Sequence, residues 1–433
     1  MAKVYNLFLL LCFVAVIPTL HANILANTTY AKQHITTIDN EYWKEKAAIA
    51  RKMSEEAYFP DPHELSRNFT SLITEDIAGN SHVRRNLNGQ RAGVACEATN
   101  NIDRCWRCDP NWADNRQKLV NCVQGFGRKT TGGKGGPIYI VTSPADNDMV
   151  NPKPGTLRHA VTRDGPLWII FARSMNIRLN QELMVSSNKT IDGRGVDIYI
   201  TKGAGITLQY VNNVIIHGIK IHDIVPGSGG LIRDSESHFG FRTRSDGDGI
   251  SIFGASNIWI DHVSMRKCSD GLIDAIMGST AITISNSHFT DHNDVSNYFQ
   301  LFSHYFILII FLMPRCRFGF VHVVNNDYTH WCHCAIGGSS KPTIISEGNR
   351  FVAPDNNNAK EVTKRVTNDD WKNWQWRSIN DAFVNGAFFV QSGPELVNRP
   401  FSSKDMIAGK DGSYVQRLTS FAGSLKCRVG KPC

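Results

Sequence analysis

The chain has 433 residues, of which 42% are hydrophobic and 20% are charged, so its composition excludes a disordered protein. The net charge of +8 and the pI of about 8.9 favour an acidic partner, such as a polysaccharide, an anionic lipid or a nucleic acid. Nucleic acid is disfavoured, because the sequence has no run of Lys and Arg and no nucleic-acid-binding motif.

Residues 1–22 have the pattern of a secretory signal peptide. Lys3 precedes an apolar run from Leu7 to Val16, and small and polar residues follow up to Ala22. The apolar run is too short to span a bilayer comfortably, so no membrane anchor is expected. Secretion would make three Asn-X-Thr sites available for glycosylation, which are Asn27, Asn68 and Asn188.

Residues 23–95 form an N-terminal extension in which we expect one helix. Apolar residues recur at helical spacing from Glu41 to Ala57, and Pro60 and Pro62 end the pattern. The apolar stripe consists of Trp43, Ala47, Ala50 and Met53. The extension shows no residues of evident chemistry, and we expect it to dock on the main domain.

Cys12 leaves with the signal peptide, and the other ten of the eleven cysteines would meet an oxidising compartment. Cys105 and Cys122 flank a compact segment and could close a loop, whereas Cys105 and Cys108 have the spacing of a zinc or redox pair. No second pair and no histidine cluster supports zinc, so a disulfide is the preferred interpretation. Cys427 and Cys433 are available to each other or to other partners.

A repeat runs through the centre of the chain. Two apolar residues separated by one position, with a third apolar residue five positions later, recur with starts at Val214, Ile258, Ile282 and Val321. A unit that starts at Ile344 fits more loosely, because position 346 is Ser. Each unit is a short strand that ends in a turn, and a period of roughly 20–50 residues indicates a stacked fold. We therefore predict an all-β fold, a parallel β-helix, and interpret the 44-residue step from 214 to 258 as two coils. The 39-residue step from 282 to 321 fits no whole number of coils.

The predicted main domain covers residues 96–395, and residues 396–433 form a C-terminal tail. We expect the coils to run to about Phe351. The polar segment from Asp355 to Ser378 is expected to wrap around the outside of the domain.

Five aspartates lie between positions 246 and 274, and several stand beside glycines. Asp246 and Asp270 are 24 residues apart, so a coil of that length would place one above the other on the same wall. Stacked carboxylates repel one another unless a hard cation lies among them, and Ca²⁺ takes oxygen ligands of this kind. The alternative is that these residues are ordinary turn aspartates.

Seven motifs in a fixed order carry a resemblance to a known family. They are Ile102–Asp109, Gly132–Pro137, Asn151–His159, Ser245–Ile252, Trp259–His262, Asp270–Thr280 and Met313–Arg317. The chain resembles the plant pectate lyases of polysaccharide lyase family 1 over roughly residues 96 to 395. The resemblance implies a right-handed parallel β-helix, secretion to the plant cell wall, and a monomer acting on acidic polysaccharide. It also implies Ca²⁺-dependent eliminative cleavage of de-esterified pectin to oligosaccharides with 4,5-unsaturated galacturonate ends.

The resemblance also assigns roles to individual residues. Asp246, Asp270 and Asp274 match the Ca²⁺ ligands of the family, and Asp248 could assist them. Arg317 matches an arginine that helps to bind the substrate, and the fork of its guanidinium suits a carboxylate. Asp261 lies in a motif that we interpret as structural, so we expect it in the core or behind the ligands.

The sequence departs from the family where the catalytic base is expected. The resemblance places that base, an arginine, directly before Met313, but the residue there is Leu312, which cannot accept a proton. From Ser296 to Leu312 the chain has no Gly, no acid and no Lys or Arg, and the segment is shorter than in the family. We therefore expect little or no turnover from the chain as written.

Three explanations for residues 296–312 remain open. The preferred one is an intron misread as an exon, and the second is a real protein with an inactivated groove. A membrane segment is disfavoured, because the apolar run from Tyr305 to Met313 is too short to span. The alternative functions are accordingly an inactive pectate-binding wall protein, or a defective gene-model product that does not accumulate.

Overall fold

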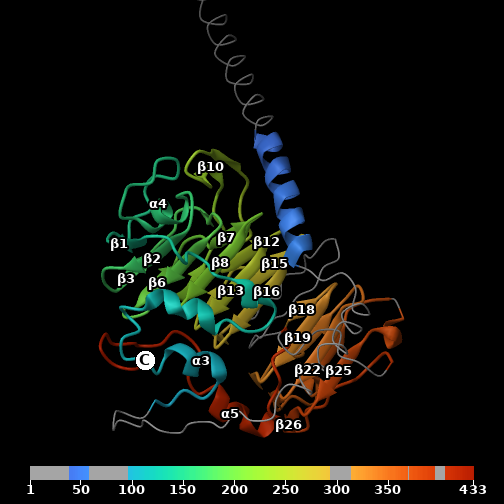
Figure 1. The fold of residues 1–433 in the computed structure, drawn as a ribbon. Helices are drawn as coiled ribbons and strands as arrows, with labels where there is room; N and C mark the ends of the chain where they lie inside the picture. The colour runs from blue at the N-terminus through green and yellow to red at the C-terminus, as the bar shows by residue number, and fades with distance from the viewer. Residues whose placement is uncertain (1–38, 58–95, 293–313, 369, 395–404) are drawn as a thin grey trace, which may run out of the picture.

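The computed structural model describes residues 39–57, 96–292, 314–368, 370–394 and 405–433. Its strands stack as successive coils, and the ladders that join one coil to the next are parallel (Figure 1). This arrangement confirms the predicted parallel β-helix. The described helices are short except for the N-terminal helix, residues 39–57, which confirms the helix expected over 41–57.

Three sheets form an N-terminal stack. The first sheet holds β1 (Ile138–Val141), β2 (Leu167–Phe171), β5 (Lys189–Asp192), β8 (Asn212–His217), β13 (Ser256–Asp261) and β16 (Thr280–Ser285). The second sheet holds β3 (Met175–Ile177), β6 (Ile198–Thr201), β9 (Lys220–Ile224), β14 (Ser264–Cys268) and β17 (His288–Thr290). The third sheet holds β4 (Leu183–Met184), β7 (Ile206–Gln209), β12 (Ile250–Phe253) and β15 (Ile273–Ile276).

Branched aliphatic side chains fill the interior of the N-terminal stack. Because successive residues of a strand point to opposite faces, the alternating pattern of the repeat sends every second side chain inward. Two fully buried rows cross β8, β13 and β16, namely Val214–Ile258–Ile282 and Ile216–Ile260–Ile284. Each such side chain contributes about 1.5–3 kcal/mol by its burial, which makes these rows a main source of stability.

The 44-residue step is one coil, so its interpretation as two coils was wrong. Ile258 of β13 pairs directly with Val214 of β8, with no strand between them. The additional residues form an antiparallel hairpin, β10 (Gly230–Arg233) and β11 (Phe239–Arg242), inserted between β9 and β12. The hairpin and its connections lengthen the coil by about the length of another coil, which is why spacing alone misled.

A C-terminal stack repeats the architecture with its own core. Its sheets hold β18 (Arg315–Cys316), β21 (Ile336–Gly338) and β24 (Thr363–Arg365); β19 (Phe320–Val324), β22 (Thr343–Glu347) and β25 (Trp376–Ile379); and β20 (Asp327–Thr329), β23 (Arg350–Val352) and β26 (Ala382–Val384). Strands β24 to β26 extend the coils beyond Phe351. The expectation that residues 355–378 only wrap around the outside was therefore wrong.

The two stacks meet at the irregular step of the repeat. Within the described residues, all three sheets of the N-terminal stack end at β15, β16 and β17, and no ladder joins them to β18, β19 and β20. The interval between the stacks contains residues 293–313, which lie outside the described residues.

Short helices and disulfides lie outside the stacks. The helices are α3 (Asn101–Trp106), α4 (Leu157–Val161), α5 (Val415–Leu418), and the 3₁₀ turns η1 (Arg116–Cys122), η2 (Phe126–Lys129), η3 (Asn357–Ala359), η4 (Trp371–Asn373) and η5 (Gly412–Tyr414). The disulfides are Cys96–Cys108, Cys105–Cys122 and Cys427–Cys433. They confirm the disulfide interpretation of Cys105, while Cys96 as the partner of Cys108 was not predicted. In the part of the chain that the structure describes, no helix has the length and apolarity to cross a bilayer.

Stacked asparagines stabilise the turns of the C-terminal stack. Asn349 is fully buried, and its Oδ1 accepts hydrogen bonds from the backbone N–H of Asn326 (2.8 Å) and from the Asn326 side chain (3.1 Å). Its Nδ2 donates to the carbonyl oxygen of Val323 at 2.9 Å. The side chain therefore satisfies polar groups that have no access to water.

Replacing Asn349 by Ala should lower the free energy of unfolding by roughly 1–3 kcal/mol, because buried partners lose their hydrogen bonds. Urea unfolding measures the change. The exposed Asn357, replaced in the same way, should change the value by less than about 0.5 kcal/mol. Equal effects of the two substitutions would show that the ladder does not stabilise the fold.

Candidate active site

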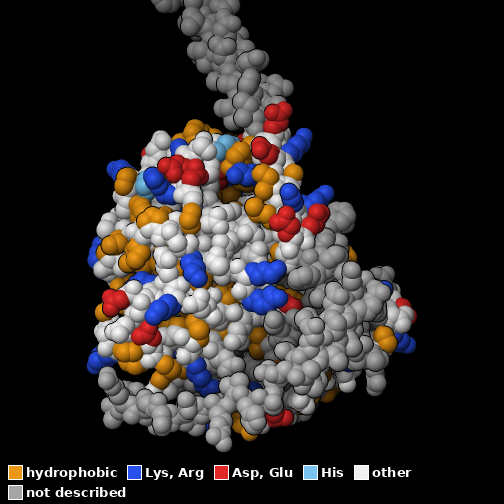
Figure 2. Space-filling model, in the orientation of Figure 1, with side chains coloured by type: hydrophobic (Ala, Val, Ile, Leu, Met, Phe, Trp, Pro, Cys, Tyr) orange, Lys and Arg blue, Asp and Glu red, His pale blue; other side chains and the backbone are white. Residues whose placement is uncertain are grey.

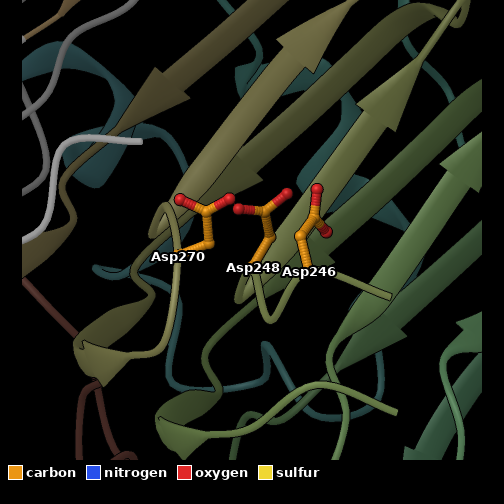
Figure 3. Close-up of side chains that lie close together, drawn as sticks. All are labelled: Asp246, Asp248 and Asp270. Carbon is orange, nitrogen blue, oxygen red and sulfur yellow. The ribbon is translucent and has the colours of Figure 1, made fainter. Parts of the chain in front are cut away.

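Three aspartates meet at the edge of the third sheet. Asp246 and Asp248 precede β12, and Asp270 precedes β15, the next strand of the same sheet. Because Ile250 pairs with Ile273, the two loops lie one above the other. One carboxylate oxygen of each aspartate lies within 4.8 Å of the others. Figure 3 shows the three carboxylates in a row, all pointing to the same side.

Glycines allow the two loops to approach so closely. A Cβ on Gly249 would lie 2.3 Å from Cε of Met265 in the core, and a Cβ on Gly271 would lie 2.3 Å from Oδ1 of Asp274. Gly247 has a φ of +107°, a backbone conformation that residues with a Cβ rarely adopt. The alternation of Asp and Gly in the sequence therefore has a steric reason.

Asp274 lies beside this group. It pairs with Ser251 across the β12–β15 ladder, and its side chain is directed toward Gly271. In the described chain, the group of acids within 4.8 Å of one another comprises Asp246, Asp248 and Asp270. Asp248, to which the resemblance gave only an assisting role, thus lies between Asp246 and Asp270 (Figure 3), and of its three neighbouring charges that of Asp274 acts on it most strongly. The ligand roles of the four aspartates stay predictions.

The electrostatics of Asp248 favour a bound cation. Burial, followed by the charges of Asp274, Asp246 and Asp270, raises the pKa of Asp248 to about 9. Its Oδ2 accepts a hydrogen bond from the Ser251 hydroxyl (2.9 Å), and its Oδ1 accepts one from the Gly271 N–H (2.8 Å). Two donors do not offset three neighbouring acids, whereas a divalent cation among hard oxygen donors would. The residues therefore fit a metal ion.

The donors to Asp248 were missed at the level of sequence. Ile250 and Ile252 are fully buried, so Ser251 between them must point outward beside the aspartates. That alternation was a usable signal for Ser251. The N–H of Gly271 carried no comparable signal, because its direction depends on the loop conformation.

Arg317 lies in the C-terminal stack, one residue after β18. Its side chain is half-buried, and burial together with the charge of Arg315 lowers its pKa. The expected base position, Leu312, lies outside the described residues. The substrate-binding role of Arg317 therefore stays a prediction.

Asp261 belongs to a buried network on another side of the stack, which confirms its interpretation as a core residue. Its Oδ1 accepts a hydrogen bond from the Ser285 hydroxyl at 2.6 Å, and both residues are buried. The next residue, His262, places Nε2 2.9 Å from Oδ1 of Asp103 and Nδ1 2.8 Å from the carbonyl oxygen of Gly423. Burial acts to lower the pKa of His262, but the charge of Asp261 and the bond to Asp103 raise it. The motif thus attaches the C-terminal tail to the first sheet.

Comparison with known proteins agrees with this architecture. A family model described as "Pectate lyase, N terminus" matches residues 34–87, and one described as "Pectate lyase" matches residues 124–386. A pectate lyase of Lilium longiflorum is 55% identical over 424 residues, covering 94% of this chain and 97% of its own. A probable pectate lyase of Arabidopsis thaliana is 50% identical over 483 residues, covering 100% of this chain and 99% of its own.

A solved structure supports the fold as well. The crystal structure of Jun a 1, the major allergen from cedar pollen, superimposes with a TM-score of 0.69 at 42% sequence identity. The match covers 76% of this chain and 100% of that one. Since one family model spans more than half of the sequence, and relatives of 50% identity or more cover nearly all of it, the chain belongs to the plant pectate lyase family.

Proposed function

We propose that this chain is a pectate lyase whose third sheet binds polygalacturonate through Ca²⁺. The observation that carries the proposal is the convergence of Asp246, Asp248 and Asp270 to within 4.8 Å beside the partly buried Asp274. Carboxylate oxygens of this density suit Ca²⁺, which takes six to eight oxygen ligands and tolerates irregular geometry. A substrate in which every unit carries a carboxylate can supply further ligands to the same ion.

The chemistry follows from the substrate. Each galacturonate unit has a carboxylate beside the carbon–hydrogen bond at carbon 5. Bound Ca²⁺ would withdraw charge from that carboxylate and favour loss of the proton. Asp246, Asp248, Asp270 and Asp274 would hold the ion, and the guanidinium of Arg317 suits a galacturonate carboxylate through paired hydrogen bonds. The glycosidic oxygen then leaves by β-elimination, so no residue needs to activate water.

The resemblance to the family places the catalytic base directly before Met313, and the sequence departs from the family pattern at this position. Leu312 stands there, and a leucine cannot accept a proton. We therefore propose a chain with an intact cation site that turns the substrate over slowly or not at all. The second candidate function is an inactive pectate-binding wall protein, and Leu312 at the position expected for the base favours it.

We also propose that the protein is secreted to the plant cell wall. Its three disulfides support this, because disulfides persist in oxidising compartments. The expected signal peptide, Asn27 and Asn68 lie outside the described residues. Asn188 is half-buried, and its Oδ1 accepts a hydrogen bond from Nδ2 of Asn213 at 2.7 Å. Glycosylation at the three asparagines stays a prediction.

Replacing Arg317 by Ala should weaken polygalacturonate binding about 10- to 100-fold, the range expected for lost charge-assisted hydrogen bonds of about 1.5–3 kcal/mol. The affinity for Ca²⁺ alone should stay the same. Calorimetric titration with oligogalacturonate at saturating Ca²⁺ measures the loss. The matched control is Arg178→Ala, because Arg178 is exposed on a different part of the stack. Unchanged binding by the Arg317 variant would contradict the assigned role.

A further inference from the structure

The N-terminal helix, residues 39–57, is attached to the β10–β11 hairpin by its first turn. Asp39 accepts a hydrogen bond from the backbone N–H of Phe241 at 2.8 Å. The Tyr42 hydroxyl donates to Oδ1 of Asp234 at 2.8 Å, and the Tyr42 ring stacks on the ring of His238 with a centroid distance of 3.6 Å. These contacts join residues that are nearly 200 positions apart in sequence, so the helix has a specific docking site.

Trp43 of the helix contacts both the hairpin and the third sheet. Its ring lies 6.2 Å from the ring of Tyr210, which directly follows β7, and under the guanidinium of Arg242 at 5.4 Å. The Tyr210 ring in turn lies 5.4 Å from the ring of Phe253, the last residue of β12. Phe253 points outward, because Ile252 before it is fully buried in the core. The helix therefore rests on the outer face of the third sheet.

The carboxylates stand on this same face. Arg242 donates to Oε1 of Glu182 at 2.8 Å, and Oε2 of Glu182 accepts a hydrogen bond from Thr207 at 2.7 Å. Thr207 pairs with Ser251, whose hydroxyl donates to Asp248. A continuous row of outward side chains thus connects the residues under the helix to the centre of the cation site.

The helix is covered beyond its first turn as well. Ala50 is 3% exposed and Ser54 is 8% exposed, although both lie far from the hairpin along the helix. A helix of this length spans about 28 Å, which exceeds the width of several strands. In Figure 1 it runs from the hairpin past β12 and β15, and Figure 2 shows acidic and basic side chains mixed on its open side. One face is thus bound to protein, and the other faces solvent.

We propose that the N-terminal helix is a built-in cover of the polysaccharide site. The inference rests on the proposed function, because it assigns the occupant that the cover excludes. A polygalacturonate chain that is held at Asp246, Asp248 and Asp270 and continues along the outer face of the third sheet would meet the helix there. Substrate and helix then compete, and the apparent affinity falls in proportion to the fraction of molecules with the helix displaced.

The variant Trp43→Ala in the full-length chain tests the cover. Loss of the contacts with Tyr210 and Arg242 should populate the displaced helix and tighten Ca²⁺-dependent polygalacturonate binding by about five- to tenfold. Tyr42→Phe keeps the ring stack and loses only the hydrogen bond to Asp234, so it should tighten binding by about twofold. The control Ile49→Ala changes an exposed residue of the same helix and should leave affinity unchanged. Calorimetric titration measures all three.

If Trp43→Ala and the parent chain bind polygalacturonate with equal affinity, the helix does not cover the site. If the variant binds more weakly, the helix contributes to the binding site and does not compete with the substrate. Amide hydrogen exchange of residues 39–57 gives a second readout in the unmodified chain, where saturating polygalacturonate should accelerate exchange. Slower exchange would contradict displacement. The variant Asp248→Asn distinguishes failure of the two proposals. Ca²⁺-dependent polygalacturonate binding that persists in Asp248→Asn refutes the proposed site, whereas equal affinities of Trp43→Ala and the parent chain refute only the covering role of the helix. Absence of binding in every chain refutes both.

Discussion

Replacement of Asp248 by Asn should weaken Ca²⁺ binding by about 100-fold or more, or about 2.7 kcal/mol. Asp248 lies between Asp246 and Asp270 (Figure 3) and is 6% exposed, and burial and the charges of three neighbouring acids raise its pKa. The amide removes one charged ligand and keeps the shape of the side chain. Calorimetric titration of the purified chain with CaCl₂ measures the affinity directly.

Thermal unfolding gives an independent measure of the same effect. Ca²⁺ at 100 times its dissociation constant should stabilise the parent chain by about 2.7 kcal/mol, and Asp248→Asn should lose this gain. Without Ca²⁺ the variant should be the more stable of the two, because it no longer holds a buried acid among three others. The control is Asp114→Asn, which changes an exposed aspartate. A variant that binds Ca²⁺ as tightly as the parent would place the ion elsewhere.

The second large effect concerns turnover. The chain as written should form unsaturated oligogalacturonide about 10²- to 10⁴-fold more slowly than the lily relative, because general-base catalysis typically contributes that factor. The reason is Leu312, which offers no group to remove the proton at carbon 5. Ultraviolet absorbance of the unsaturated product, followed at saturating Ca²⁺ and alkaline pH, measures the rate. Turnover within tenfold of the lily enzyme would contradict the assignment of the base position.

The transcript decides what a low rate means. Sequencing across codons 290–320 should reveal either a longer segment that ends in arginine before Met313, or the segment as printed. The first result would make Leu312 an annotation artefact and restore the active enzyme. The second would leave a relative of the lyases without its base, and polysaccharide binding would then be its remaining activity.

The strands of the β-helix could be predicted because their signal is local. The repeat starts at 214, 258, 282, 321 and 344 all fall in strands, since alternation of apolar residues is imposed by burial on one side. The number of coils could not be predicted in the same way. The inserted hairpin β10–β11, together with its connections, adds about the length of one coil, and only the pairing of β8 with β13 shows that no coil lies between them.

The site was predictable as far as it depends on the period of the coil. The separation of Asp246 and Asp270 predicted their convergence, because neighbouring coils repeat nearly the same number of residues. The proximity of Asp248 to Asp246, Asp270 and Asp274 depends on loop conformation, which spacing does not determine. The docking of Tyr42 on Asp234 joins residues 192 positions apart, and no periodicity connects them. Contacts of this kind appear only in the folded chain.

The central claim is that carboxylates on the third sheet hold polygalacturonate through a cation. Titration of the parent chain with oligogalacturonate, once with Ca²⁺ and once with a chelator, tests it most directly. The account predicts binding that requires Ca²⁺ and that disappears in Asp248→Asn, whether or not the chain turns the substrate over. Binding that persists in the chelator and in the variant would contradict the claim, and would place the polysaccharide on the basic surface instead.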